Sequence, residues 1–187
     1  PILVISSLLV AVILQKIVKG NLLKIGFLFP MAIPVASVVL LWKGVFDPQG
    51  FLNSFLNLFG ISGNDWMNTQ SAFWVLVFSY VWKNMGYCMI LWLASLAAIP
   101  KEIYEAAKID GSGEVACFLY ITLPNLLSSF FTITVISLIN SFKVYREAYL
   151  VAGDYPDQSI YMMQHLFNNW CRDLSLDKLA VGAVINT

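Results

Sequence analysis

The residues best suited to chemistry at another protein's surface lie in a short segment after Pro100. Pro100 suits the start of a helix, and Glu102 and Glu105 favour the positive N-terminal end of that helix. Gly111 tolerates positive φ, so the helix is expected to stop there. One face of the helix carries mainly small or apolar side chains, namely Ile103, Ala106, Ala107 and Asp110. Small side chains let a second surface approach closely, so this spacing favours protein docking.

Catalytic and metal-binding chemistry has little support in the sequence. The three cysteines, Cys88, Cys117 and Cys171, are widely spaced, and the single histidine is His165. This pattern indicates neither a disulfide framework nor a zinc site, and a lone His in a polar loop is expected at the surface. No Gly-x-x-x-x-Gly-Lys-Ser/Thr phosphate loop occurs. The chain is therefore expected to hold no catalytic residue, metal or cofactor and not to be an enzyme.

Two sets of polar residues interrupt the apolar stretches that precede and follow the segment after Pro100, which is called the docking segment below. Lys83 and Asn84 lie in the first stretch, with Tyr87 one helical turn after Lys83. A charge at the bilayer centre costs about 2.5 to 3.5 kcal/mol unless it faces protein or water. The second set recurs at helical spacing and consists of Ser137, Asn140 and Ser141. Both sets are expected to face a cavity or a partner helix.

The composition places the chain in a bilayer. Hydrophobic residues make up 59% of the 187 positions, charged residues 12%, and the mean hydropathy is +0.74. Soluble domains carry roughly 25% charged residues. The 11 Lys and Arg balance the 11 Asp and Glu, so no basic excess is left to bind nucleic acid.

About 20 mostly apolar residues are needed to cross the hydrocarbon core, and this length predicts four spans and the start of a fifth. They cover residues 1–14, 25–46, 71–99, 125–142, and the segment from 174 onward. The expected fold class is an all-α polytopic membrane helical bundle. Residues 1–187 would form a single transmembrane domain, truncated at both ends, with a structured loop at 100–124.

Local signals predict how these spans bend and connect. Pro30 and Pro34 fall inside the second span and predict a kink. Residues 47–50 predict a turn, and residues 51–59 repeat apolar side chains at helical spacing, as in a helix lying in the membrane interface. The loops on the two sides of the predicted spans tie in their number of Lys and Arg, but Lys16, Lys19 and Lys24 are concentrated in one short loop, which favours a cytoplasmic location for it.

The segment from Glu105 to Pro124 resembles the cytoplasmic docking signature of binding-protein-dependent import permeases. That signature reads Glu-Ala-Ala, three residues, Gly, nine residues, Ile, one residue, Leu-Pro. Every position is filled at that spacing: Glu105, Ala106, Ala107, Gly111, Ile121, Leu123 and Pro124. The resemblance implies a helix pair that fits a cleft on an ATPase subunit, with Glu105 meeting a basic group and residues 105–111, Asp110 included, providing mechanical coupling. An ordinary amphipathic loop helix would explain Gly111 but not the spacing to Pro124.

Nearly the whole chain resembles a carbohydrate-type permease of the maltose and glycerol-phosphate importer group, which has a MetI-like fold. The matching stretches are Phe29-Pro30, Ile33-Pro34, Trp42-Lys43, 46–53, Trp82-Lys83, Gly86, Leu96, 99–100 and 107–111. One turn departs from the group's Gly-Gly-Gly-Pro-like pattern and reads Ala152-Gly153-Asp154-Tyr155-Pro156. This departure leaves the substrate open.

The resemblance assigns the two polar sets to a substrate pathway formed by Lys83, Asn84, Tyr87, Ser137, Asn140 and Ser141. The alternative is that these groups join helices to one another, as Ser and Asn commonly do in membranes. Four tryptophans could stack on sugar rings, but an aromatic belt at span ends is the preferred interpretation for them. They are Trp42, Trp66, Trp74 and Trp170.

The resemblance also implies partners and a location. The expected partners are ABC ATPase subunits that bind the ATP, a second permease subunit or a copy of this one, an extracytoplasmic solute-binding protein and the lipid bilayer. The expected location is the inner membrane of a bacterium or archaeon, with the coupling loop in the cytoplasm. A non-sugar solute such as a glycerol phosphodiester is the nearer alternative, and an intramembrane enzyme is the remote one.

Overall fold

A computed structural model describes residues 1–17 and 22–185, and every regular element in that part of the chain is a helix. This confirms the all-α class. The chain forms two compact units, one made of Pro1–Ala32 with Val81–Ser141 and the other of Ile33–Tyr80 with the chain from Phe142 onward. The prediction of a single domain over 1–187 stays a prediction.

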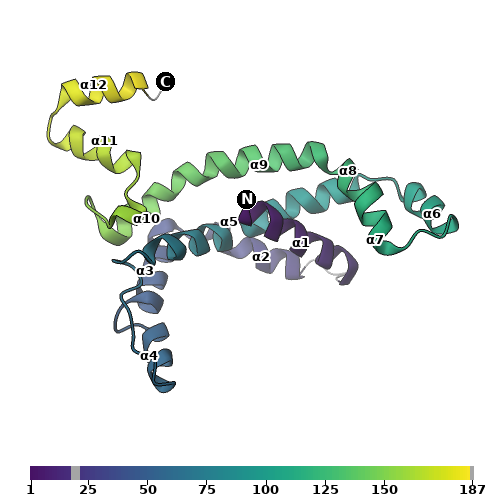
Figure 1. The fold of residues 1–187 in the computed structure, drawn as a ribbon, viewed down its shortest axis with the longest axis horizontal. Coiled ribbons are helices and arrows are strands. Elements are labelled where there is room, and N and C mark those ends of the chain that lie inside the picture. Colours follow the sequence, from purple (N-terminus) through teal and green to yellow (C-terminus); the bar gives the residue numbers. More distant parts are fainter. Residues whose placement is uncertain (18–21, 186–187) are drawn as a thin grey trace. The chain divides into compact units, whose positions relative to one another are not determined.

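The first unit contains three long helices that lie side by side, α1, α5 and α9 (Figure 1). Its elements are α1 (Ile2–Ile17), α2 (Leu22–Ala32), the later part of α5 (Ala72–Ala97), α6 (Lys101–Ile109), α7 (Glu114–Cys117), a π-helix (Phe118–Thr122), α8 (Leu123–Asn125) and α9 (Leu127–Ser141). Trp92 is fully buried at its centre, where its Nε1 donates to Ser7 Oγ at 3.1 Å. That bond satisfies the buried indole, as a packed Trp requires.

Gly86 allows α2 and α5 to approach closely. A Cβ built at Gly86 would lie 1.9 Å from the backbone oxygen of Phe27, far inside van der Waals contact. Only glycine fits such a crossing, because small residues let helix backbones meet in a membrane bundle. The helix pair is therefore set by backbone packing at this point.

The second unit is built around the start of α5. Its elements are α3 (Val35–Phe46), α4 (Phe51–Leu58), the first turns of α5, a 3₁₀ turn (Phe142–Val144), α10 (Tyr145–Ala152), a second 3₁₀ turn (Gln158–Ile160), α11 (Met163–Arg172) and α12 (Leu176–Ile185). A small core joins Ala72 and Leu76 of α5 to Ala148 of α10 and to Ile160.

The predicted second span is broken at Pro34. α2 ends at Ala32 and α3 begins at Val35, while Pro34 has extended dihedrals (φ −57°, ψ 142°). Pro34 cannot donate a backbone hydrogen bond and pushes Ile33 out of the helical region, which is the physical reason for the break. Pro30, by contrast, stays inside α2. The kink is thus confirmed and lies at Pro34.

Within the described residues, the helix over Leu127–Ala152 is long and apolar enough by itself to cross a membrane. Up to three spans result when each of two bent helix pairs is counted as one, and Ile2–Gln15 is a shorter apolar helix. The predicted count of four spans and the start of a fifth therefore stays a prediction. The lysine-rich loop behind the orientation prediction includes Lys19, which lies outside the described residues.

The aromatic-belt interpretation is wrong for Trp42. Its side chain is buried, its Nε1 donates to Ser79 Oγ at 2.8 Å, and its ring packs edge-on against Phe78. The hydrogen bond to α5 supplies the polar partner that headgroups would otherwise provide. Trp74, at 65% exposure near the start of α5, suits a belt position.

Candidate functional site

The docking segment folds as a short helix held away from the spans. The chain bends by 63° between α5 and α6, and Pro100 stands at the N-cap of α6 with extended dihedrals. Glu102 lies in the first turn of α6 and Lys108 in the last, so both charges complement the helix dipole. The predicted helix start is confirmed.

Gly111 ends α6 in a Schellman motif. Its φ is +80°, the N–H of Ser112 donates to Ala107 O at 2.9 Å, and the N–H of Gly111 donates to Lys108 O at 3.1 Å. These two bonds satisfy carbonyls that would otherwise be left open at the helix end. The predicted positive φ of Gly111 is confirmed, and α6 is therefore a sharply bounded unit.

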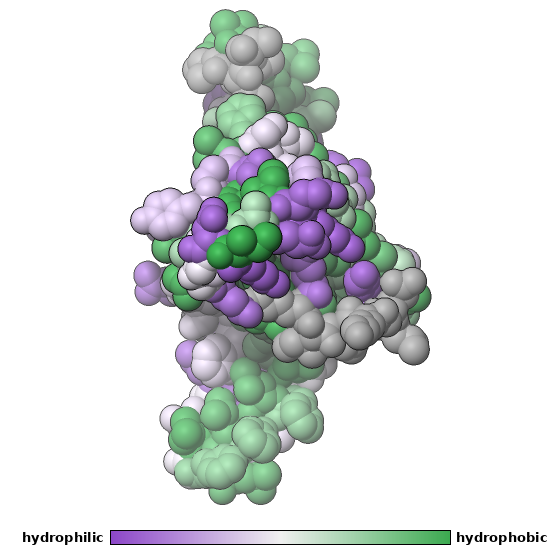
Figure 2. Space-filling model, turned by 90° about the vertical axis from the view of Figure 1, so that its right-hand side faces the viewer, coloured by the Kyte–Doolittle hydropathy of each residue, from purple (hydrophilic) through white to green (hydrophobic). Residues whose placement is uncertain are grey.

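The signature residues of α6 are open to an approaching surface. Glu105, Ala106, Asp110 and Gly111 are exposed, and Ala107 is half-buried. Figure 2 faces this end of the first unit and shows a small apolar patch surrounded by hydrophilic side chains. The large exposed apolar residues of α6 and α7 are Ile103, Ile109 and Val115. A rim of charge around a small apolar centre suits docking to another protein.

The base of the loop is tied back to α6 by a hydrogen bond that sequence reasoning missed. The hydrogen bond joins Tyr104 Oη and Thr122 Oγ1, which are 2.8 Å apart, and Thr122 is buried. Thr122 closes the π-helix, in which the N–H of Leu123 donates to Phe118 O five residues back. The intervening Thr between the signature residues Ile121 and Leu123 therefore has a structural role of its own.

The π-helix is followed directly by α8, which contains Pro124. Proline has no N–H to donate to a preceding carbonyl, so one bond of the helical ladder is missing at this position. The side chain of Asn125 instead donates to Ile121 O at 2.7 Å, and the N–H of Leu126 donates to Thr122 O at 3.1 Å. Ile121 is half-buried, whereas Leu123 and Pro124 are exposed. The second part of the signature thus shapes the joint between the loop and α9.

The polar residues assigned to a substrate pathway lie on α5 and α9 of the first unit. Ser137 is buried, with its Oγ 3.5 Å from Cys88 Sγ on α5, which is the contact expected of residues that join helices. Ser141 is exposed and donates to Leu138 O of its own helix at 2.6 Å. The remaining members are all half-buried: Lys83, Asn84, Tyr87 and Asn140. The pathway assignment stays a prediction.

Residues 2–169 match the model of one protein family, described as the binding-protein-dependent transport system inner membrane component. The match covers most of the chain, including the whole loop over residues 100–124, which is called the docking loop below. The chain belongs to this family. It is an inner-membrane transport permease by family, and the predicted resemblance is confirmed.

Relatives of this permease include transport proteins from bacteria and an archaeon. It is 31% identical to the trehalose/maltose transport system permease protein MalF of Thermococcus litoralis over 94% of this chain and 60% of that protein. It is 34% identical to the sn-glycerol-3-phosphate transport system permease protein UgpA of Escherichia coli over 73% of this chain and 47% of that one. The probable ABC transporter permease protein YurN of Bacillus subtilis is 30% identical over 81% and 54%. The chain spans about half the length of these relatives.

A solved structure has the same fold as this permease. The match is to the crystal structure of a bacterial ABC transporter involved in the import of the acidic polysaccharide alginate, with a TM-score of 0.85. It covers 96% of this chain and 65% of the other, at 19% sequence identity. This likeness supports the predicted permease fold.

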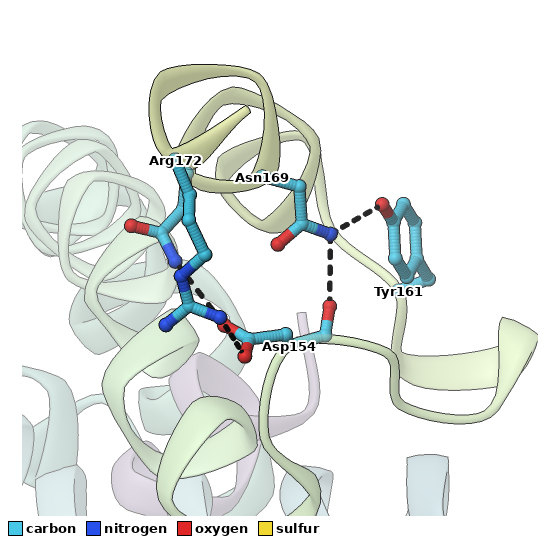
Figure 3. Close-up of polar contacts among 5 residues, drawn as sticks. Asp154, Tyr161, Asn169 and Arg172 are labelled. Carbon is cyan, nitrogen blue, oxygen red and sulfur yellow. Dashed lines mark hydrogen bonds and ion pairs between the residues drawn. The ribbon is translucent and has the colours of Figure 1, made fainter. Parts of the chain in front are cut away.

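The permease contains a polar corner between α10 and α11 that sequence reasoning did not find (Figure 3). Asn169 Nδ2 donates to Asp154 O at 3.0 Å and to Tyr161 Oη at 3.3 Å, and Arg172 forms an ion pair with Asp154. Asp154 lies in the turn over residues 152–156. Gly153 in the same turn has φ +74° and ψ −147°, a conformation open essentially to glycine alone. This turn therefore has a glycine, Gly153, at the position where the backbone conformation requires one.

The expectation that His165 lies at the surface is wrong. The structure places it in α11 with 0% exposure, 4.7 Å from Tyr145 and 5.5 Å from Tyr161 between ring centroids. Its Nδ1 accepts the N–H of Met162 at 3.1 Å, so the neutral ring carries its proton on Nε2. Burial lowers the pKa of His165. The segment is an amphipathic helix rather than a polar loop, and His165 lies on its inner face, as does Asn169.

Proposed function

We propose that this chain is the membrane-spanning permease subunit of an ATP-driven, binding-protein-dependent importer for sugars or oligosaccharides. The observation that carries the proposal is the loop over residues 100–124, which holds the full signature: Glu105 to Gly111 lie on and directly after the exposed helix α6, and Ile121, Leu123 and Pro124 lie where the loop returns toward α9. The family match over residues 2–169 supports the same role. ATP would be bound and hydrolysed by partner ATPase subunits, with this chain converting their movement into translocation.

The mechanism follows from the geometry of the loop. Glu105 offers an exposed carboxylate to a basic group on the ATPase subunit, and the neighbouring alanines allow close approach. Pro100 marks the start of α6 and the Schellman motif at Gly111 marks its end, so we expect the helix to move as one rigid piece. The Tyr104–Thr122 hydrogen bond then links that movement to the start of α9.

The remaining partners follow from the same proposal. A second permease subunit or another copy of this one would complete the pathway, and an extracytoplasmic solute-binding protein would deliver the substrate. The coupling loop would lie in the cytoplasm of a bacterial or archaeal cell. A sugar is favoured by the relative named for trehalose and maltose, and a glycerol phosphodiester is the second candidate because another relative is named for sn-glycerol-3-phosphate.

The test is copurification followed by an ATPase assay. The full-length permease, tagged and expressed with its neighbouring genes, should copurify with an ABC ATPase in stoichiometric amounts. Its ATPase activity in lipid should rise when the binding protein is loaded with a sugar. Stimulation by a glycerol phosphodiester alone would replace the sugar assignment, whereas failure to recover any ATPase would overturn the importer role.

A further inference from the structure

The short helix α4 has a one-sided aromatic surface with no protein covering it in the described chain. Phe51, Phe55 and Phe59 follow one another at intervals of four residues, with ring centroids 6.5 Å and 5.2 Å apart. Phe51 is 73% exposed and Leu58, on the same side, is 81% exposed. Exposed apolar patches of this kind mark contact with lipid or with another protein.

The opposite side of α4 is locked in place by Asn53, which is 1% exposed. Its Nδ2 donates to the backbone oxygens of Asp47 (3.2 Å), Pro48 (3.1 Å) and Asn64 (2.7 Å). Its Oδ1 accepts from the N–H of Asn64 (3.2 Å) and from Nε1 of Trp66 (2.8 Å). These bonds attach one face of α4 to the turn before it and to the loop after it. The helix therefore cannot rotate to hide its phenylalanines.

We infer that α4 is an interfacial anchor whose phenylalanine face is immersed in the lipid at the end of α3, with Asn53 fixing which face points to the lipid. The helix follows α3 after a four-residue turn, and α3 ends at Phe46, where the sequence predicts the end of the second span. Leu40 and Leu41 of α3 are also exposed, so the helix that precedes α4 has uncovered apolar side chains as well. A docked protein partner is the rival occupant.

The chemistry of α4 specifies the kind of lipid contact. The helix sequence FLNSFLNL contains no charged residue, and its polar side carries only asparagine and serine. Amphipathic helices that select anionic lipids carry Lys or Arg on the polar face. The anchor is therefore driven by apolar burial and is indifferent to lipid charge.

The test uses the assembled transporter in nanodiscs, with Cys88, Cys117 and Cys171 replaced and one new cysteine labelled with an environment-sensitive fluorophore. Labels at Phe55→Cys and Leu58→Cys should be quenched strongly by lipids carrying a nitroxide high on the acyl chain and hardly by aqueous iodide. The label at Asn57→Cys, on the polar side, should show the reverse. Replacing neutral lipid by anionic lipid should leave all three results unchanged.

The role of Asn53 is tested by adding Asn53→Ala to each labelled protein, with Asn57→Ala as the matched control in the Phe55 and Leu58 proteins. Asn53→Ala should reduce the contrast between the two faces, and Asn57→Ala should preserve it. Iodide quenching at Phe55 and Leu58 would overturn lipid immersion in favour of water. Protection from both quenchers would overturn it in favour of a protein partner. If Asn53→Ala does not assemble, the labels in the parent protein still decide the occupant.

Discussion

At the scale of single residues, two different residues of the docking loop supply its charge and its special backbone conformation. Glu105 is exposed and contributes a carboxylate, whereas Gly111 contributes a conformation that other residues disfavour. Each residue has a nearby counterpart in the same loop that lacks the proposed role. Glu102 is a second exposed acid, and Gly113 is a second glycine with an ordinary φ of −74°. These pairs allow each contribution to be tested against a matched control.

Glu105→Lys is expected to abolish ATP-dependent transport while the protein still inserts in the membrane. The change reverses a charge in a water-exposed helix and touches no span, so folding should be preserved. Uptake and membrane abundance should be measured together, with Glu102→Lys as the control that retains transport. Normal uptake by Glu105→Lys, or its loss from the membrane, would count against the docking role of this carboxylate.

Gly111→Val is expected to weaken coupling without changing any charge. A side chain in the left-handed region costs about 1–2 kcal/mol, which corresponds to a factor of roughly 5–30 in the population of the capped loop. No atom lies within 4 Å of a Cβ at either Gly111 or Gly113, so steric crowding affects neither. Gly113→Val should therefore keep near-normal substrate-stimulated ATPase activity. Equal loss in both variants would contradict an effect of backbone strain.

At the scale of elements, close helix packing and buried polar groups decide how each unit is held together. The α2–α5 crossing depends on Gly86, and the α10–α11 corner depends on a neutral His165 on the inner face of α11. Both features concern contacts between segments that are apart in the chain. Disrupting either feature should lower the stability of the folded protein more than it alters the docking of α6 to an ATPase subunit.

Gly86→Ala is expected to lower the thermal stability of the detergent-solubilised transporter. The added methyl would overlap the backbone of Phe27, and overpacking of this kind costs typically about 1–3 kcal/mol. Gly26→Ala, on the partner helix α2, meets no atom within 4 Å and should leave the melting temperature unchanged or raise it. A Gly86→Ala protein that melts with the wild type would show that α2 and α5 separate without penalty.

The α10–α11 corner is expected to lose stability as the pH falls below about 6.5, the ordinary pKa of histidine. Because burial lowers the pKa of His165 in the folded protein, the unfolded chain binds the proton first. Stability is therefore complete above the unfolded pKa and declines as the pH falls toward the lower folded value. Protonation also removes the Nδ1 lone pair that accepts the N–H of Met162.

Hydrogen exchange of residues 145–172 measures this effect, since protection should fall at mildly acidic pH in the wild type. Tyr145, Tyr149 and Tyr161 pack around His165, Asp154 pairs with Arg172 at the same corner, and Arg146, Glu147 and Asp157 lie in the same stretch of chain. His165 is the single histidine of the chain, and histidine is the side chain whose unperturbed pKa lies between pH 5 and 8. His165→Gln should therefore show protection, relative to the intrinsic exchange rate at each pH, that does not depend on pH in this range. A pH dependence that persists in His165→Gln would assign it to another group.

At the scale of the whole molecule, the substrate pathway is the feature that depends most on assembly. Single cysteines at Asn84, Tyr87, Asn140 and Ser141, in a background without Cys88, Cys117 and Cys171, should react with a membrane-impermeant thiol reagent. Bound substrate should protect them. Leu138→Cys, on an exposed apolar side of α9, is the control and should stay inert in lipid. Inertness of all pathway positions in both resting and ATP-bound states would assign these groups to helix packing.

The sequence by itself determined the all-α class, the family, a kink in the stretch that holds Pro30 and Pro34, and the positive φ of Gly111; the structure placed that kink at Pro34. These features depend on the chemistry of residues that are close in the chain. Proline lacks an N–H, glycine lacks a Cβ, and a helix end must satisfy its own carbonyls. The spacing of the docking signature is local in the same sense, because it lies within one loop.

Only the tertiary structure decided which polar and aromatic side chains are buried. His165, Trp42 and Ser137 each meet a partner from another helix, and the clash at Gly86 is with the backbone of α2. In an apolar chain, side chains that face lipid and side chains that face protein have similar composition, so periodicity cannot tell the two surfaces apart. The same applies to α4. The spacing of its apolar residues predicts the helix, but it does not predict that Asn53 is buried and orients the phenylalanines.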